Sequence, residues 1–306
     1  MSGPGQWLAR GAAAGNAAAD RTDQWLGGSI GALSYLAWLP LLLTVASLPR
    51  ASDLAFIGAR LFSSGSFPWN VLLLASLATG AVLFACLLAA LAEAVLLRGA
   101  GRETPGRSLA RETEAAFSVV LMAALPAIVA VAILATGVAV VAPAEFGAPD
   151  LGAPLWLRIA AHLVPLLAVL AVLIVVGQAI GAAALRRAIG PDAMPVGAAL
   201  RSGLRDLVRR PATRLGLAIA SMVIDLLSLV LATAVLRVLW APIRVELGGG
   251  HLVSPQALLL LVGFVAIWLT LVLAFGAIRA WVSAWWSLEL AAADEGARPE
   301  GQEVNS

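Results

Sequence analysis

The sequence contains no lysine, one cysteine and two histidines, and charged residues fill only 12% of its 306 positions. The lone Cys86 excludes an intrachain disulfide and a thiolate metal site. His162 and His251 are far apart, and neither has an acidic or histidine neighbour at ligand spacing, so we expect no metal and no cofactor. A soluble domain carries about 25% charged residues, so the scarcity of charge excludes a water-exposed surface over most of the chain.

Hydrophobic residues take the place of the missing charge. They make up 61% of the chain, and the mean hydropathy is +0.93. In lipid, every backbone polar group must be hydrogen-bonded internally, and helices of about 20 apolar residues meet this need. We therefore predict an all-α integral membrane protein with six transmembrane helices. The predicted spans are residues 27–48, 71–97, 117–142, 156–185, 213–240 and 256–280.

Two polar segments flank this six-helix membrane domain, which we place at residues 27–290. Residues 1–26 are mildly amphipathic and lack the short apolar core of a secretory signal, so we expect a cytoplasmic amphipathic segment before a retained first helix. Residues 291–306 are acidic and contain glycine and proline, which is typical of a disordered cytoplasmic tail.

The arginines indicate which side of the bilayer each connecting segment occupies. Residues 186–214 carry seven arginines and only two acidic residues, Asp192 and Asp206. Short loops rich in arginine stay on the cytoplasmic side of a membrane. Placing both termini in the cytoplasm puts most of the 20 basic residues there, so this is the predicted topology. No basic domain is interleaved with aromatic residues, so we expect no nucleic-acid partner.

Proline and arginine recur at a fixed offset before two of the spans. Arg111 lies six residues after Pro105, and Arg201 lies six residues after Pro195. Each pair predicts a short basic helix with one apolar face, lying along the inner surface before the chain enters the next span.

The N-terminal segment keeps the same offset between Pro4 and Arg10. We therefore predict three units, each a surface helix followed by a membrane hairpin. Aligning Pro40 with Pro126 gives a different spacing, so the register of the first copy stays open. The alternative is six helices joined by unrelated basic loops.

Proline also marks the predicted outer loops. Pro49, Pro143 and Pro242 each follow an odd-numbered span. Proline lacks the backbone N–H, and its ring clashes with the preceding turn, so we expect each of the three to end its helix.

Three basic amphipathic segments that lead into three membrane hairpins resemble bacterial six-helix membrane families of largely unknown function. One is the membrane domain attached to some glycerophosphodiester phosphodiesterases, and another is the YciC-like inner-membrane proteins. The resemblance rests on layout and on the proline-to-arginine spacing, without a diagnostic motif. It implies a multi-pass protein of the bacterial plasma membrane and no known reaction. The chain has no phosphodiesterase catalytic domain, so that activity is not carried over.

Asp225 is the most conspicuous polar residue inside a predicted span, where a carboxylate costs about 2.5 to 3.5 kcal/mol on insertion scales. Ser221, Asp225 and Ser228 share one face of that helix, and Glu93 lies near the cytoplasmic end of another span. These four residues are a candidate intramembrane polar site that could line an ion or proton path. The alternative is an aspartate that holds helices together and a glutamate in an interfacial salt bridge.

A second candidate site is the arginine-rich inner surface. Anionic lipid attracts nearby arginines, and each contributes on the order of 1 kcal/mol. We expect anionic headgroups or a protein partner to bind Arg107, Arg111, Arg201, Arg205, Arg209, Arg210 and Arg214.

Two short motifs have simpler interpretations. Gly177 and Gly181 have the spacing that lets helix backbones approach closely, which we assign to internal packing before dimerisation. Residues 27–31 match the G-x-S-x-G pattern at Ser29, but a nucleophile elbow needs a preceding strand and a nearby histidine. Both histidines are predicted at the outer face, so the match does not indicate catalysis.

No constellation of nucleophile, base or metal ligand emerges, and we predict that the chain is not an enzyme. The favoured function is a non-enzymatic plasma-membrane protein whose arginine-rich cytoplasmic surface binds anionic lipid or a protein partner. The alternative is a transport or permease component that uses a polar path at Asp225.

Overall fold

A computed structural model describes residues 4–40, 60, 63–101, 106–147, 155–191, 193–248 and 254–295. Every element in these ranges is a helix. In chain order they are α1 (Pro4–Ala19), α2 (Thr22–Leu36), α5 (Trp69–Gly99), α6 (Leu109–Gly147), α7 (Leu155–Ile189), α8 (Val196–Arg209), α9 (Pro211–Gly248) and α10 (Pro255–Glu295).

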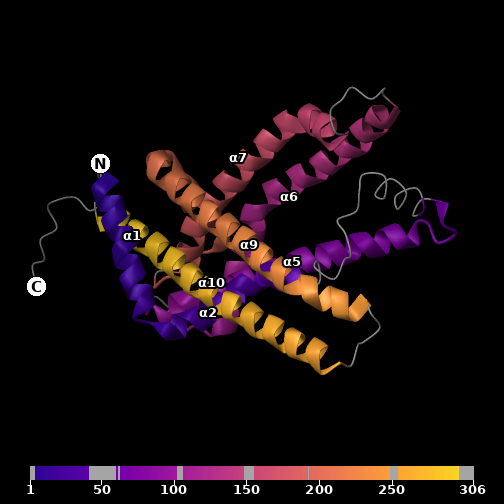
Figure 1. Cartoon of the computed structure of the whole chain (residues 1–306). Coiled ribbons are helices and arrows are strands. Elements are labelled where there is room, and N and C mark those ends of the chain that lie inside the picture. The colour runs from indigo at the N-terminus through magenta and orange to yellow at the C-terminus, as the bar shows by residue number, and fades with distance from the viewer. Residues whose placement is uncertain are drawn as a thin grey trace, which may run out of the picture.

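The long helices fan out from one packed hub. Figure 1 shows α6 and α7 leaving it together in one direction, α5 in a second and the far ends of α9 and α10 in a third. The short helix α1 lies across the C-terminal half of α10, and α2 runs along α10 near the hub. The inner ends of the long helices are therefore packed together, while their outer ends separate.

Five helices in the described ranges are long and apolar enough to cross a membrane: α5, α6, α7, α9 and α10. This supports an all-α, multi-pass membrane protein. The first predicted span, 27–48, is described only through residue 40, where α2 contributes its residues up to Leu36. The rest of this first span and the Pro49 stop that follows it lie outside the described residues, so both stay predictions.

Exposure changes along each long helix. In α5, Leu73 and Leu77 near the outer end are 60% and 61% exposed, whereas Ala90 and Ala94 near the inner end are fully buried. The outer halves of α6, α7, α9 and α10 likewise carry many exposed apolar side chains. Such surfaces are compatible with lipid tails, so the protein core sits at the inner end of the fan.

Glycines allow the closest helix contacts in the hub. A methyl group added at Gly28 of α2 would overlap the backbone of Gly276 in α10, so the two helices cross backbone against backbone. In the same way, side chains at Gly177 and Gly181 of α7 would collide with Ala123 of α6. The Gly177–Gly181 motif therefore packs two helices within the chain, as the spacing predicts.

The prediction that proline ends the odd-numbered helices is wrong at two positions. Helix α6 continues through Pro143 to Gly147, and α9 continues through Pro242 to Gly248. One proline removes a single helical hydrogen bond, and membrane helices tolerate this because neighbouring groups can satisfy the freed carbonyl.

The predicted surface helices have two different outcomes. Helix α8 is a separate 14-residue helix that begins directly after Pro195, as expected. The helix predicted from Pro105 is not separate, because residues from Leu109 onward belong to the continuous 39-residue α6. Pro105 itself lies outside the described residues. No proline lies between this basic segment and the predicted span, so the two form one continuous helix.

The end of the chain is also more helical than predicted. Helix α10 runs for 41 residues to Glu295, beyond the predicted span end at residue 280 and five residues into the predicted disordered tail. Packing explains the extension, because Trp285, Trp286 and Leu290 are at most 5% exposed. Residues 296–306 lie outside the described ranges.

Candidate functional site

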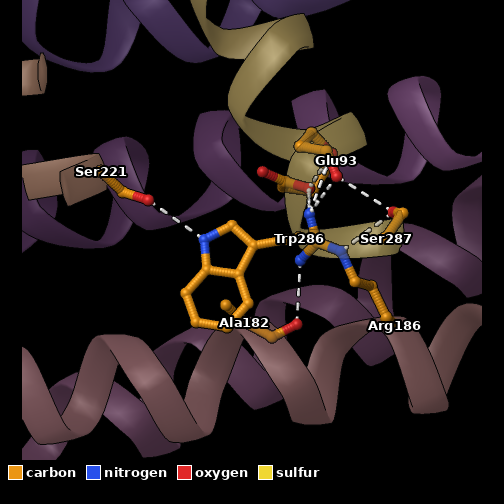
Figure 2. A network of polar contacts seen from close by, with 7 residues as sticks. Glu93, Ala182, Arg186, Ser221, Trp286 and Ser287 are labelled. Atoms are coloured by element: carbon orange, nitrogen blue, oxygen red, sulfur yellow. Dashed lines mark hydrogen bonds and ion pairs between the residues drawn. The ribbon is translucent and has the colours of Figure 1, made fainter. Parts of the chain in front are cut away.

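A buried arginine joins three helices at the centre of the hub. The Arg186 guanidinium of α7 is paired with Glu93 of α5, with Nη2 3.4 Å from Oε2. It also donates from Nη2 to the Ser283 hydroxyl (3.0 Å) and from Nε to the Ser287 hydroxyl (3.1 Å), both on α10. Figure 2 shows this guanidinium between Glu93 and Ser287. One side chain therefore links α5, α7 and α10.

The Arg186 charge is compensated on all sides. Nη1 donates to the carbonyl of Ala182, one turn earlier in α7, and Nη2 also donates to the carbonyl of Ser283. Ser283 in turn donates its hydroxyl to Glu93 Oε2 at 2.8 Å. The Arg186 side chain is only 6% exposed, so these bonds offset the desolvation that a buried charge would otherwise suffer.

Indole and hydroxyl groups extend the polar contacts to α9. Trp286 of α10 donates its Nε1–H to the Ser221 hydroxyl at 3.1 Å, and Ser221 donates to the carbonyl of Leu217. Figure 2 shows the Trp286 ring between Ser221 and Arg186. The Arg186 guanidinium carbon lies 6.0 Å from the Trp286 ring centroid, at the outer limit of a cation–π contact.

Asp225 forms a second ion pair. Its Oδ2 lies 3.2 Å from Nη2 of Arg279 on α10, and both side chains are 26% exposed. The Arg279 guanidinium carbon also lies 5.6 Å from the ring centroid of Tyr35, near the C-terminal end of α2. The carboxylate predicted at mid-membrane is thus held by a cation from a neighbouring helix.

The four residues of the predicted polar site have different partners. Ser221, Asp225 and Ser228 share the inward face of α9, where the two serines are 1% and 7% exposed. Glu93 pairs with Arg186, whereas Asp225 pairs with Arg279. The predicted site therefore consists of two separate ion pairs. The Glu93–Arg186 pair joins α5 to α7, and the Asp225–Arg279 pair joins α9 to α10.

Sequence reasoning missed the partners of these acids. The sequence places Arg186 only within the arginine-rich cytoplasmic segment 186–214, and no pattern in it pairs Arg279 with Asp225. The signal that could have identified Arg186 is its helical phase. It follows Ala179 and Ala183 at steps of four and three on α7, and both alanines are 1% exposed.

The exposed arginines of α8 form the basic surface of the hub. Arg201, Arg205 and Arg209 are exposed at successive turns of α8, and Arg210 follows directly. Leu204 and Val208 lie between them and are 49% and 72% exposed. The opposite face of α8 is buried against α7, where a side chain at Gly203 would meet the backbone of Ile180. Helix α8 thus presents both cations and apolar groups outward.

Arg107 lies two residues before the start of α6, and Arg111 lies in the first turn of that helix. Arg111 is exposed. Arg107 donates from Nη1 to the carbonyl of Ala188 at 3.2 Å, and its own carbonyl accepts a bond from Arg98. Arg98 also pairs with the fully buried Glu112 at 3.3 Å. Arg107 therefore helps to join α6 to α7 as well as adding positive charge.

Arg214 does not belong to the exposed basic surface, contrary to the prediction. It is 1% exposed, and its Nε lies 2.7 Å from Oδ2 of Asp206 on α8. It falls on the same face of α9 as Leu217, Ala218 and Ser221, all of which are at most 1% exposed. Arg214 fixes α8 against α9 and is not available to a lipid or a partner.

The comparisons with known proteins add no further constraint. No protein-family model, no curated protein and no solved structure matches this chain.

Proposed function

We propose that this chain is a non-enzymatic, multi-pass protein of a bacterial plasma membrane, and that its cytoplasmic surface binds anionic lipid headgroups. The observation that carries the proposal is the exposed face of α8, where Arg201, Arg205 and Arg209 alternate with Leu204 and Val208. A helix with this composition lies in the interface, with its apolar groups among the acyl chains and its cations at the phosphates.

The position of α8 fits this role. Helix α8 follows α7 and precedes α9 in the chain, and it packs against both at the inner end of the fan. It is therefore a separate helix and not the continuation of a span. Arg210 and Arg111 add charge near the same end of the long helices. The six-span topology with cytoplasmic termini, and the three-unit repeat with one surface helix merged into α6, belong to the same proposal.

The alternative is a transport component that uses a polar path at Asp225. The pairing of Asp225 with Arg279, and of Glu93 with Arg186, favours a structural role for both acids. A carboxylate that carries protons or cations must exchange its partner during the cycle, whereas a fixed counter-ion from a neighbouring helix holds two helices together.

The test compares two sets of arginine variants in the full chain, purified in mild detergent and titrated with phosphatidylglycerol under native mass spectrometry. In the first set, Arg201, Arg205 and Arg209 are replaced by glutamine. If the three contributions of about 1 kcal/mol add, lipid binding weakens by about 100-fold. The control replaces Arg60, Arg237 and Arg244, which are exposed on other segments, and leaves binding within about twofold of the parent.

Equal lipid binding by the two sets would refute the proposal. A soluble protein that co-purifies with the parent and is lost from the α8 variant, while lipid binding is unchanged, would identify the surface as a protein-docking site instead.

A further inference from the structure

A groove of about 540 Å³ lies between α5 and α6 at the edge of the hub. Its volume falls within the range of about 300–1,000 Å³ that is typical of ligand sites. Most of its wall is apolar and comes from Leu87 and Leu91 of α5 and from Leu109, Ala110 and Phe117 of α6. Leu87 is 43% exposed, so the groove is continuous with the apolar outer surface of α5. A hydrocarbon chain is therefore the group that this wall suits.

The groove runs along α6 from its first turn into the apolar part of the helix. Ala110, Thr113, Glu114 and Phe117 line it from one face of α6, as residues three and four apart do. Leu109 and Phe117 are eight residues apart, which is about 12 Å at the helical rise of 1.5 Å per residue. A chain that enters at Leu109 thus lies along the helix in the direction of its outer end.

The entrance of the groove, at Leu109 and Ala110, offers hydrogen-bond donors. Ser108 accepts the N–H of Arg111 with its hydroxyl, at 3.5 Å, and the N–H of Glu112 with its carbonyl. No described residue accepts the N–H of Leu109 or of Ala110, the first two residues of α6. The free N–H groups of a helix N-terminus carry partial positive charge and bind phosphate well. The entrance therefore suits an anionic oxygen.

A buried hydroxyl in the groove also has no partner. Thr113 lines the groove, its Oγ1 is buried, and none of the described residues hydrogen-bonds that atom. A helical threonine often donates to the carbonyl four residues earlier, as Thr136 of α6 does to Ala132. Leaving a buried hydroxyl unpaired is costly. Thr113 lies about one helical turn beyond the entrance, so a ligand with a phosphate at the entrance and a carbonyl one turn deeper would satisfy both.

The charged side chains at the entrance are more basic than acidic. Arg111 is exposed in the first turn of α6, and Arg107 lies two residues before the helix. Glu114 is exposed and is the one acid among the residues that line the groove. Two cations attract a phosphate, and the carboxylate accepts hydrogen bonds from the glycerol or ethanolamine part of a headgroup.

We propose that the groove holds one phospholipid of the cytoplasmic leaflet, with an acyl chain between α5 and α6 and its phosphate at the first turn of α6. The hydroxyl of Thr113 donates to an ester carbonyl, which follows the phosphate through the glycerol unit. The site is separate from the arginines of α8, and it rests on the proposed function only for the leaflet that it meets. An apolar helix of a second copy would fill the groove but leave the N–H groups of Leu109 and Ala110 without an acceptor.

The experiment titrates the purified full chain, in mild detergent, with phosphatidylglycerol, phosphatidylethanolamine and diacylglycerol of matched acyl chains under native mass spectrometry. Only diacylglycerol lacks a phosphate. The chain is expected to bind both phospholipids more tightly than diacylglycerol by about tenfold or more, because the entrance is built for a phosphate. This comparison needs no variant, so it tests the phosphate contact in the unaltered protein.

Two matched pairs of variants on α6 locate the site. Ala110→Phe places a ring in the groove from an exposed position, and Ala132→Phe adds the same ring at an exposed position outside it. Thr113→Val removes the unpaired hydroxyl, and Thr136→Val removes one that is bonded within its own helix. Phospholipid binding is expected to weaken by about tenfold or more in Ala110→Phe and by about fivefold in Thr113→Val. Both control variants are expected to stay within about twofold of the parent.

Equal affinities for diacylglycerol and the phospholipids would overturn the proposal, and so would equal affinities within either pair of variants. A dimer of the parent that Ala110→Phe dissociates, with phospholipid affinity unchanged, would overturn it in favour of a second copy. If Ala110→Phe fails to fold, the Thr113→Val pair and the diacylglycerol comparison still decide. Repeating the titration with the three α8 arginines replaced by glutamine keeps the two sites apart. The differences between groove and control variants persist there, whether or not α8 binds anionic lipid.

Discussion

Asp225 of α9 and Arg279 of α10 form an ion pair inside the helix bundle, with Oδ2 and Nη2 3.2 Å apart. The two residues lie on consecutive helices whose far ends point in the same direction (Figure 1). The pair therefore ties α9 to α10. Its polarity is compatible with a membrane setting because each charge has its counter-ion.

Replacing Asp225 tests whether this pair is structural. Asp225→Asn leaves Arg279 without its counter-ion, and we expect a loss of about 1–3 kcal/mol, between the values for exposed and buried pairs. Thermal unfolding in detergent measures the loss as a lower Tm. Asp225→Leu combined with Arg279→Leu removes both charges and is expected to recover part of it. A double variant less stable than Asp225→Asn would contradict a purely structural role for the pair.

Arg186 and Arg187 are adjacent arginines with opposite surroundings, which makes them a matched pair for mutation. Arg186→Gln removes a cation that is 6% exposed and leaves Glu93 without its counter-ion, so we expect a loss of about 3–5 kcal/mol. Arg187 pairs with Asp294, which is 68% exposed, and Arg187→Gln is expected to cost less than about 1 kcal/mol. Size-exclusion profiles after stepwise heating would show the first variant aggregating at a lower temperature. Similar profiles for both variants would refute the central role given to Arg186.

The crossing of α2 and α10 predicts a sharp difference between glycines. Gly28→Ala and Gly276→Ala place a methyl group inside the facing backbone, and overpacking of this kind costs about 1–3 kcal/mol or more. Gly216 and Gly263 are helical glycines with open space around them, so their alanine variants are expected to be neutral or stabilising by up to about 1 kcal/mol. Expression level and Tm measure both effects. Tolerance of alanine at residue 28 would mean that the helices do not cross there.

Much of the architecture could be predicted from the sequence because it depends on local patterns. Apolar runs place the five spans that the structure supports, and the phase of the α8 arginines places them on an exposed face. The spacing of Gly177 and Gly181 predicts a close helix contact within the chain, and the structure places that contact between α7 and α6. Each of these features is contained within about 30 neighbouring residues.

The partners of the buried charges could not be predicted, because they are distant in sequence. Arg186 lies 93 residues from Glu93 and 97 residues from Ser283. No local pattern selects one partner among several acids. The burial of Arg214 is different, because the phase that it shares with Leu217 and Ala218 marks it as inward-facing. Treating the whole arginine-rich segment as one surface concealed that signal.

Docking of α1 on α10 should control access to the N-terminal arginines. Trp281 donates to the carbonyl of Gly11 at 2.8 Å, and a side chain at Gly11 would press on the Trp285 ring. Gly11→Leu is therefore expected to displace α1 and to speed tryptic cleavage at Arg10 by about tenfold, since a loss of about 1.4 kcal/mol is a tenfold change in the open population. The chain has no lysine, so trypsin cuts only at arginine and the fragment is unambiguous.

The control for this proteolysis is Ala12→Leu, which adds the same side chain at an exposed position of α1. It should leave the cleavage rate unchanged. Equal acceleration by both variants would show that helix composition, and not contact with α10, decides the rate.

The predicted topology places α8 in the cytoplasm and the far end of α9 outside. Arg209 on α8 and Val245 near the end of α9 are both exposed, so a cysteine at either position is accessible to a reagent from its own side. In a Cys86→Ala background, a membrane-impermeant maleimide added to intact cells should label Val245→Cys and not Arg209→Cys. Both should react once the membrane is permeabilised, because the residues differ in side and not in exposure. Labelling of Arg209→Cys in intact cells would place the α8 arginines outside. Anionic lipid of the cytoplasmic leaflet could then not be their ligand, because the arginines would face the outer leaflet.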